Sequence, residues 1–232
     1  MKTKAAILWE RNTPWSVEEI ELDPPKAGEV LVKLAASGMC HSDEHLVTGD
    51  LAGATPEPPL IGGHEGAGVV MEVGDGVFSL QPGDHVVFGF VPACGRCPSC
   101  AEGHSNLCDI GSLTATGLQI TDQTSRHHAQ SGQDLTLGIG NLGTFAHHTV
   151  VNEASCIKIA PDLPMDKACL LGCGVVTGWG SAVYAAVVQP GETVAVVGVG
   201  GIGAIAVQGA KLAGARVVAA IDPVEFKREK AM

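Results

Sequence analysis

The sequence predicts an α/β chain in two parts, a β-rich first part followed by a parallel sheet. Short apolar runs separated by turn residues fill the first half, as in a small barrel or sandwich. Beyond about residue 165, apolar runs alternate with a helical run, which is typical of parallel strands covered on both faces. A length of 232 residues suits one to two domains. We therefore predict domains at 1–172 and 173–232.

The charge balance restricts the class of partner. Fourteen basic and 25 acidic residues give a net charge of −11, which argues against nucleic acid and anionic membranes as partners. The most apolar stretch, 194–207, holds four glycines and is shorter than the ~18 residues of a membrane span. Glu10 and Arg11 interrupt the apolar N-terminus, unlike a signal peptide. We expect a cytoplasmic protein.

The elements of the first part follow from alternation and turn residues. Residues 109–142 are polar and contain several glycines, which indicates a long loop or surface excursion. Residues 40–48 have the pattern of a short helix, and 145–159 return to a strand-like pattern. The remaining strands are predicted at 4–10, 29–36, 67–73 and 85–88.

The second part reads as a helical region at 166–188 and then one βαβ unit. The unit has a strand at 193–198, a helix at 200–215 and a strand at 216–222. One βαβ unit leaves bare sheet edges and an uncovered apolar face. We expect either that the chain is a fragment or that something else completes the sheet.

Four cysteines form a cluster in the first part. The spacing C-x2-C-x2-C-x7-C lets four thiolates converge on one ion, a closed set typical of structural zinc. Unrelated thiols, two disulfides or an iron–sulfur cluster are the alternatives, because spacing alone does not fix the metal. The cysteines are Cys94, Cys97, Cys100 and Cys108.

A glycine motif opens the helix of the βαβ unit. Gly198-Val199-Gly200-Gly201-Ile202-Gly203 fits G-x-G-x-x-G directly after an apolar strand, where a pyrophosphate would rest on the helix N-terminus. Asp222 ends the next strand, 19 residues after Gly203. A carboxylate there binds a ribose 2′-hydroxyl and repels a 2′-phosphate, which favours NAD over NADP. Glycines used only for helix–strand packing are the alternative.

Cys40, His64 and Cys173 also stand out, although spacing alone cannot pair Cys40 with Cys173 across 133 residues. With these residues the sequence resembles the zinc-dependent medium-chain alcohol dehydrogenases. The stretch 63–77 matches the zinc signature G-H-E-x-x-G-x5-G-x2-V, and 172–182 matches G-C-G-x-x-T-G-x-G-S-A. The resemblance covers essentially the whole chain and is strongest to the actinobacterial nicotinoprotein type, which is recycled with an artificial nitroso acceptor.

The resemblance implies a GroES-like barrel followed by the first βαβ part of a Rossmann domain. It implies two zinc ions per chain, one structural and one catalytic on Cys40, His64 and Cys173, together with NAD. The implied reaction oxidises a small alcohol to an aldehyde or ketone by hydride transfer to NAD, with zinc as Lewis acid. A homo-oligomer is expected for the complete enzyme, whose C-terminal part this sequence lacks.

The resemblance also implies roles for single residues. Ser42 would take the alcohol proton and His45 would pass it to solvent. Asp43 would orient the ligating histidine, and Glu65 would approach the zinc during ligand exchange. His41 would contact the pyrophosphate, and Thr177 would adjoin the nicotinamide. Phe90 would line the substrate pocket. Lys227 would bind the cofactor, although it lies in a charged run typical of a solvated helix face.

Three other interpretations remain open at this point. A thiol-adduct formaldehyde dehydrogenase of the same family differs in pocket residues that this sequence does not contain. A catalytically inactive zinc-binding fragment would follow from the missing C-terminal part. Quinone oxidoreductases without zinc fit poorly with eight cysteines and the GHE stretch.

Other cysteines and histidines are expected to lie outside these sites. Cys156 and Cys169 are predicted to be packed thiols. Adjacent histidines at 127–128 and 147–148 cannot chelate from a regular strand.

Overall fold

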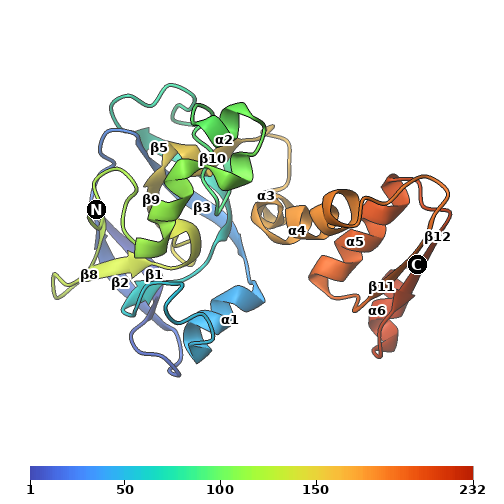
Figure 1. Cartoon of the computed structure of the whole chain (residues 1–232). Helices are drawn as coiled ribbons and strands as arrows, with labels where there is room; N and C mark the ends of the chain where they lie inside the picture. Colours follow the sequence, from blue (N-terminus) through green and yellow to red (C-terminus); the bar gives the residue numbers. More distant parts are fainter. Residues whose placement is uncertain (232) are drawn as a thin grey trace. The chain divides into compact units, whose positions relative to one another are not determined.

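The computed structural model describes residues 1–231 and divides into two compact units, Met1–Gly172 and Cys173–Met232 (Figure 1). The first unit holds the barrel strands and their connecting helices. The second unit holds one parallel strand pair with its helices. No single helix in the described part is long and apolar enough to cross a membrane. The consecutive short helices Met165–Gly172 and Gly174–Ala185 pass that test of length and composition only when joined.

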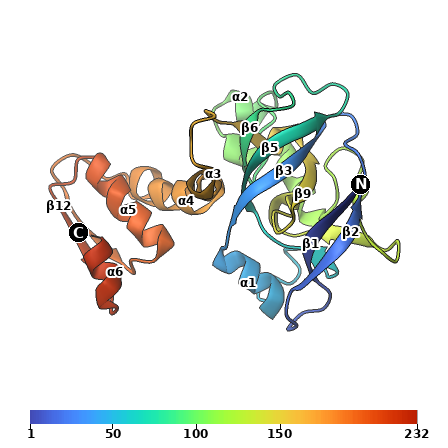
Figure 2. The same cartoon turned by 180° about the vertical axis from the view of Figure 1, so that it is seen from behind.

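Two sheets make up the first unit, and Figure 2 shows their strands from behind. One is a closed barrel in the order β1-β2-β7-β8-β4, antiparallel except for β4 and β8, which pair in parallel. The other is a five-stranded antiparallel sheet in the order β10-β6-β5-β3-β9. The strands are β1 (Lys2–Leu8), β2 (Ser16–Leu22), β3 (Glu29–Gly38), β4 (Leu60–Ile61), β5 (Glu65–Val73), β6 (His85–Phe88), β7 (His127–Ala129), β8 (Asp134–Leu137), β9 (His148–Asn152) and β10 (Cys156–Lys158).

Short helices connect these strands. Helix α1, which carries Ser42, Asp43 and His45, has the predicted bounds within one residue. The helices and single turns of the first unit are α1 (His41–Thr48), α2 (Pro98–Ala101), η1 (Ser105–Leu107), η2 (Asp109–Thr116), η3 (Ile139–Asn141), η4 (Glu153–Ser155), α3 (Met165–Ala168) and η5 (Cys169–Gly172).

Strand alternation builds the cores of the first unit. In β1 the residues alternate between buried and exposed, because successive side chains of a strand point to opposite faces. Ile7 and Ile20 pack with β8 leucines inside the barrel. Val32, Val70 and Phe88 centre a second core on the five-stranded sheet. The closed arrangement of these strands confirms the predicted barrel.

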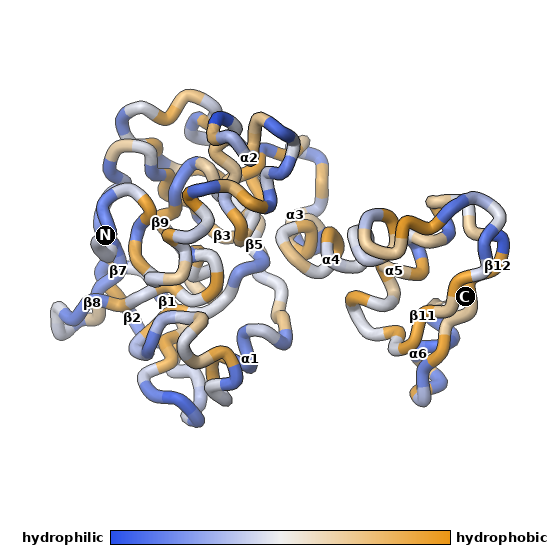
Figure 3. The backbone as a smooth tube through the Cα atoms, in the orientation of Figure 1, coloured by the Kyte–Doolittle hydropathy of each residue, from blue (hydrophilic) through white to orange (hydrophobic). Residues whose placement is uncertain are grey.

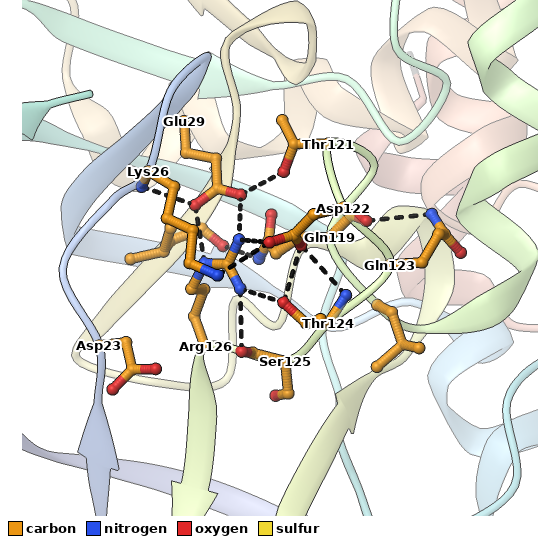
Figure 4. Close-up of polar contacts among 12 residues, drawn as sticks. Asp23, Lys26, Glu29, Gln119, Thr121, Asp122, Gln123, Thr124, Ser125 and Arg126 are labelled. Atoms are coloured by element: carbon orange, nitrogen blue, oxygen red, sulfur yellow. Dashed lines mark hydrogen bonds and ion pairs between the residues drawn. The ribbon is translucent and has the colours of Figure 1, made fainter. Parts of the chain in front are cut away.

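The prediction of a long loop at 109–142 is wrong. This segment supplies η2, η3 and two barrel strands, β7 and β8. These strands have only three and four residues, too few to show an apolar period. Arg126, directly before β7, can be buried because its charge is paired. Its Nη2 and Nε atoms donate to the Glu29 carboxylate at 2.7 and 2.9 Å (Figure 4). The sequence also gave no prediction for β2 and β4.

The second unit contains the predicted βαβ arrangement. β11 and β12 pair in parallel from Thr193–Val217 to Val197–Ile221, with α5 as the crossover helix. Both strands are hydrophobic along their length, whereas α6 is largely hydrophilic (Figure 3). Val197 is 80% exposed and Ile221 is 50% exposed, so one apolar face of the pair is open in this unit. The elements are α4 (Gly174–Gly180), the π-helical η6 (Ser181–Ala185), β11 (Thr193–Val197), α5 (Gly201–Leu212), β12 (Val217–Ile221) and α6 (Glu225–Lys230).

Candidate metal and cofactor sites

The buried carboxylate of Asp43 organises the first candidate site. Asp43 is the third residue of α1, and its side chain points inward. Its Oδ1 accepts the Gly63 N–H at 3.0 Å and lies 3.2 Å from Nδ1 of His64, while Oδ2 accepts the Cys40 N–H at 3.3 Å. A carboxylate oxygen only accepts, so the Nδ1–H of His64 donates to it. The Nε2 atom of His64 is the ring nitrogen that can bind a metal ion.

Gly63 is required for the turn that delivers His64. Its φ is +88°, and a Cβ there would lie 2.4 Å from Oγ1 of Thr144 and 2.7 Å from the Phe145 nitrogen. No other residue type fits that backbone and that space. Beyond the turn, His64 is 1% exposed and its ring stands edge-on to Phe90 at 5.9 Å between centroids.

Cys40 lies beside His64 at the start of α1. Its sulfur and a ring nitrogen of His64 lie within 4.8 Å of each other. Burial works against ionisation of this thiol, but the N–H and hydroxyl of Ser42 and the His64 ring outweigh burial and lower the pKa of Cys40. A thiolate is the form that binds a metal ion.

The chain connects Cys173 directly to the first unit. Gly172 is the last residue of that unit, and a Cβ on it would lie 2.4 Å from the Phe88 carbonyl and 3.6 Å from the His64 carbonyl. Cys173 follows after one peptide bond, which spans about 3.8 Å between Cα atoms. Cys173 is the residue directly before α4.

The other residues assigned by resemblance divide into two groups. Ser42 touches Cys40, and Glu65 is 3% exposed and packs over Gly38, whose Cβ would meet its carboxylate. His41 and His45 lie one turn apart on α1, with ring centroids 4.7 Å apart. Ser42 and Glu65 thus adjoin the Cys40–His64 pair, whereas His41 is exposed and His45 is half-buried.

The four-cysteine lobe brings all four sulfurs together. They lie within 4.8 Å of one another, and the sulfurs of Cys97 and Cys108 are 3.9 Å apart. A tetrahedral zinc site with Zn–S bonds of about 2.3 Å has sulfurs about 3.8 Å apart. The arrangement therefore fits one ion held by four thiolates, with no open position.

Backbone N–H groups of the lobe point at these sulfurs. The Cys97 N–H donates to the Cys94 sulfur at 3.3 Å, and the Cys100 N–H to the Cys97 sulfur at 3.5 Å. The N–H groups of Arg96 and Cys97 lower the pKa of Cys94 to about 6. Burial and the neighbouring thiols raise the pKa of Cys100 to about 12. Without a cation, the thiols of Cys94 and Cys100 therefore differ in their tendency to ionise. A bound divalent cation would favour the thiolate form of all four cysteines.

The glycine motif forms the predicted turn between β11 and α5. A Cβ on Gly203 would lie 1.9 Å from the Gly198 carbonyl oxygen, so only glycine allows this contact between strand and helix. A Cβ on Gly200 or Gly201 would meet nothing within 4 Å. Open space therefore lies before the N-terminus of α5, where backbone N–H groups favour an anion.

Asp222 closes this loop from the end of β12. Its Oδ2 accepts the Val199 N–H at 2.8 Å, and its Oδ1 accepts the Val224 N–H at 2.9 Å. These two bonds lower the pKa of Asp222, with the charges of Lys227 and Arg228 contributing. A carboxylate has about four acceptor positions, so two remain for ribose hydroxyls.

Thr177 and Lys227 lie on helices of the second unit. The Thr177 hydroxyl lies 3.9 Å from the Cys173 sulfur within α4 and its cap. Lys227 is exposed on α6. Cys169 is buried and Cys156 packs against the core of the five-stranded sheet, and burial raises the pKa of both thiols, as expected for packed cysteines. Within β7, His127 is buried and His128 reaches Asp23 and Asp134, so the pair does not chelate.

Sequence reasoning missed one polar partner beside the site. Oδ2 of Asp50 lies 3.0 Å from Nδ1 of His45. The signal was an acidic residue directly after the glycine that ends α1, five residues from His45.

The closed barrel, the neighbouring Cys40 and His64, the four-cysteine lobe and the βαβ glycine loop together are features of the zinc-dependent medium-chain dehydrogenase class. The family model for the alcohol dehydrogenase GroES-like domain matches residues 26–162. The chain therefore belongs to this family, that of the zinc-dependent medium-chain alcohol dehydrogenases.

Individual relatives agree with this family. Alcohol dehydrogenase B of Mycobacterium tuberculosis is 53% identical over 234 residues, and the NDMA-dependent alcohol dehydrogenase of Amycolatopsis methanolica is 51% identical over 232. Both alignments cover 100% of this chain and 61% of the relative. An alcohol dehydrogenase zinc-binding domain protein from Burkholderia ambifaria superposes with a TM-score of 0.90 at 33% identity, covering 100% and 61%. Benzyl alcohol dehydrogenase from Acinetobacter calcoaceticus gives 0.87 at 29%, with the same coverage.

Proposed function

We propose that this chain carries the catalytic-zinc and cofactor-loop parts of an alcohol dehydrogenase that oxidises small alcohols to aldehydes or ketones with NAD. The chain spans 61% of the relatives it matches, so the activity is proposed for the protein as a whole. The contact chain Asp43–His64–Cys40 carries the proposal, because it prepares an imidazole nitrogen and a thiolate as neighbouring ligands.

We assign the catalytic zinc to Cys40, His64 and Cys173, and the structural zinc to the four-cysteine lobe. Two thiolates and one imidazole leave a fourth tetrahedral position for substrate, whereas four thiolates leave none. Zinc bound at the first site would supply Lewis-acid polarisation of an alcohol oxygen.

The protein's own residues would orient the alcohol and move its proton. Ser42 adjoins Cys40, so its hydroxyl can accept the alcohol proton and release its own toward solvent. His45, three residues further along α1, accepts that proton at the surface of the unit. Phe90 stands against the His64 ring and supplies an apolar wall, while Glu65 adjoins the ligands from β5.

The second unit would hold NAD. The pyrophosphate would rest at Gly200, Gly201 and the N-terminus of α5, and Asp222 would accept ribose hydroxyls. NAD supplies the hydride acceptor, while Thr177, His41 and Lys227 are the further cofactor contacts that we assign. We also propose that the complete protein is a homo-oligomer and works in the cytoplasm.

The test combines zinc content with alcohol oxidation. We expect about two zinc ions per wild-type chain and about one in Cys40→Ala, with the structural ion retained. Oxidation of primary alcohols, followed with free NAD and with a nitroso acceptor, should disappear in Cys40→Ala. Cys156→Ala, which changes a thiol outside both sites, should keep both zinc ions. Undiminished oxidation in Cys40→Ala, or one zinc in every variant, would refute the assignment.

A further inference from the structure

The end of α1 folds back on His45. α1 stops at Thr48, and Gly49 adopts a left-handed conformation with its N–H donating to the His45 carbonyl at 3.0 Å. This reversal brings the Asp50 carboxylate alongside the helix, with Oδ2 3.0 Å from Nδ1 of His45. The contact therefore follows from the helix cap, and no distant element is needed to form it.

A second hydrogen bond, independent of His45, holds the carboxylate of Asp50. The Thr48 hydroxyl donates to the same Oδ2 atom at 2.7 Å. Thr48 and then His45 lower the pKa of Asp50 by hydrogen bonding, against a small opposing effect of burial. The following turn is closed by the Ala52 N–H on the Gly49 carbonyl at 2.9 Å.

This contact selects one tautomer of the imidazole. Ionised Asp50 can only accept a hydrogen bond, so neutral His45 must carry its proton on Nδ1. Its Nε2 atom is then an acceptor, which is the form needed by a group that takes a proton from a donor. Without a partner on Nδ1, the ring could place its proton on either nitrogen and could rotate.

We propose that Asp50 is a positioning residue that holds His45 as an Nε2 acceptor for the proton released in alcohol oxidation. The inference rests on the proposed function, in which His45 passes that proton to solvent. His41 on the same helix and Asp50 both adjoin His45, while Arg11 packs against Gly49 and pairs with Glu57 at 2.8 Å.

The first test measures the tautomer directly in the zinc-loaded chain. Long-range ¹H–¹⁵N spectra above pH 8 report which nitrogen of His45 is protonated, with its signals assigned by their loss in His45→Gln. We expect an unprotonated Nε2 in the wild type and an Nε2-protonated population at least about twofold larger in Asp50→Ala. Glu44→Ala, which removes an exposed carboxylate from the same helix, should leave the tautomer unchanged.

The second test asks whether Asp50 acts through His45. In the enzyme, Asp50→Ala should lower kcat about tenfold at neutral pH with little change in KM, and added imidazole should restore part of the rate. In a His45→Ala background the same change should alter kcat less than about twofold, because a residue acting through His45 has no effect once His45 is gone. Glu44→Ala should be neutral in both backgrounds.

The outcomes separate this inference from the proposed function. Wild-type alcohol oxidation with an unchanged tautomer in Asp50→Ala, or with equal effects of Asp50→Ala in both backgrounds, overturns the positioning role alone. Absence of zinc at Cys40 and of alcohol oxidation in the wild type overturns the proposed function, and the tautomer measurement still reports the Asp50–His45 contact.

Discussion

The Nδ1 atom of His64 and the Oδ1 atom of Asp43 lie 3.2 Å apart, and both side chains are at least 95% buried. The same oxygen accepts the Gly63 N–H, and the other oxygen accepts the N–H of Cys40. One carboxylate therefore fixes the ring of one candidate ligand and the backbone of the other. A metal arriving at this pair meets ligands whose orientation is already set, as in carboxylate–histidine–zinc triads.

Asp43→Asn should weaken zinc binding at this site about 10- to 100-fold without removing a ligand. The amide can still accept, but it no longer carries the charge that makes His64 a better donor to the metal. Competition with a chromophoric chelator would measure the affinity of the weaker of the two zinc ions. Glu44→Gln on the same helix is the control and should bind zinc as the wild type does. An unchanged affinity in Asp43→Asn would show that the contact serves folding only.

The four-cysteine lobe yields a separate prediction about stability. Cys100→Ser should remove one zinc ion and lower the thermal unfolding midpoint, because binding to a structural site contributes to folding free energy. Without the ion, closely packed thiols such as Cys97 and Cys108, 3.9 Å apart, lose the charge that holds them together. Zinc stoichiometry and calorimetry on the same sample would check both effects. Cys156→Ala should keep the full zinc content, and a Cys100→Ser chain that does so as well would argue against this ligand set.

The parts of the structure that could be predicted are those formed by residues close together in the sequence. The βαβ unit follows from apolar runs in sequence, and the four cysteines lie within fifteen residues. The short helix at 40–48 is also local, since it runs over consecutive residues and ends at Gly49. In each case the residues that meet in space are also near in sequence, or follow a regular period.

What the sequence could not show depends on contacts between distant segments. Glu29 and Arg126 are 97 residues apart, and their pairing buries a polar segment that reads as a loop. Nothing local indicates that β7, with three residues, closes a barrel. The packing of Gly172 on the Phe88 carbonyl joins segments 84 residues apart, which no spacing rule contains.

Removing one partner of the buried Glu29–Arg126 pair should strongly destabilise the first unit. Their side chains are 0% and 1% exposed, and Asp122 and Thr121 complete the network (Figure 4). Glu29→Ala leaves a buried guanidinium without its main partner, which costs about 3–5 kcal/mol. Denaturant unfolding followed by tryptophan fluorescence would measure this loss, since Trp9 and Trp15 both lie in this unit.

An exposed ion pair provides the matched control. Lys2 and Glu19 are 2.8 Å apart, with side chains 62% and 41% exposed. Glu19→Ala should cost less than about 1 kcal/mol, because water screens this pair. Equal losses in Glu19→Ala and Glu29→Ala would mean that burial adds nothing to the second pair, contrary to the network seen here.

His127 should make the first unit sensitive to acid. Its side chain is fully buried, and the Thr149 hydroxyl donates to the Leu142 carbonyl at 2.7 Å, so the Nε2–H of His127 must donate to Thr149 at 3.2 Å. Nδ1 has no hydrogen-bond partner among residues 1–231. A second proton would therefore enter the core without an acceptor, and burial, with His128 and Arg126 nearby, lowers the pKa of His127 to about 3.

The sign of the pH effect follows from this lowered pKa. The unfolded chain binds a proton at His127 below about pH 6.5, while the folded chain binds one only near pH 3. The stability that depends on neutral His127 is therefore complete above pH 6.5. It is lost as the pH falls from 6.5 toward 3. His127→Leu should reduce the slope of unfolding free energy between pH 6 and 4 by up to about 1.4 kcal/mol per pH unit. His147→Gln changes an exposed histidine and should leave the slope unchanged. Parallel pH profiles for His127→Leu and the wild type would show that His127 takes up its proton in the folded state.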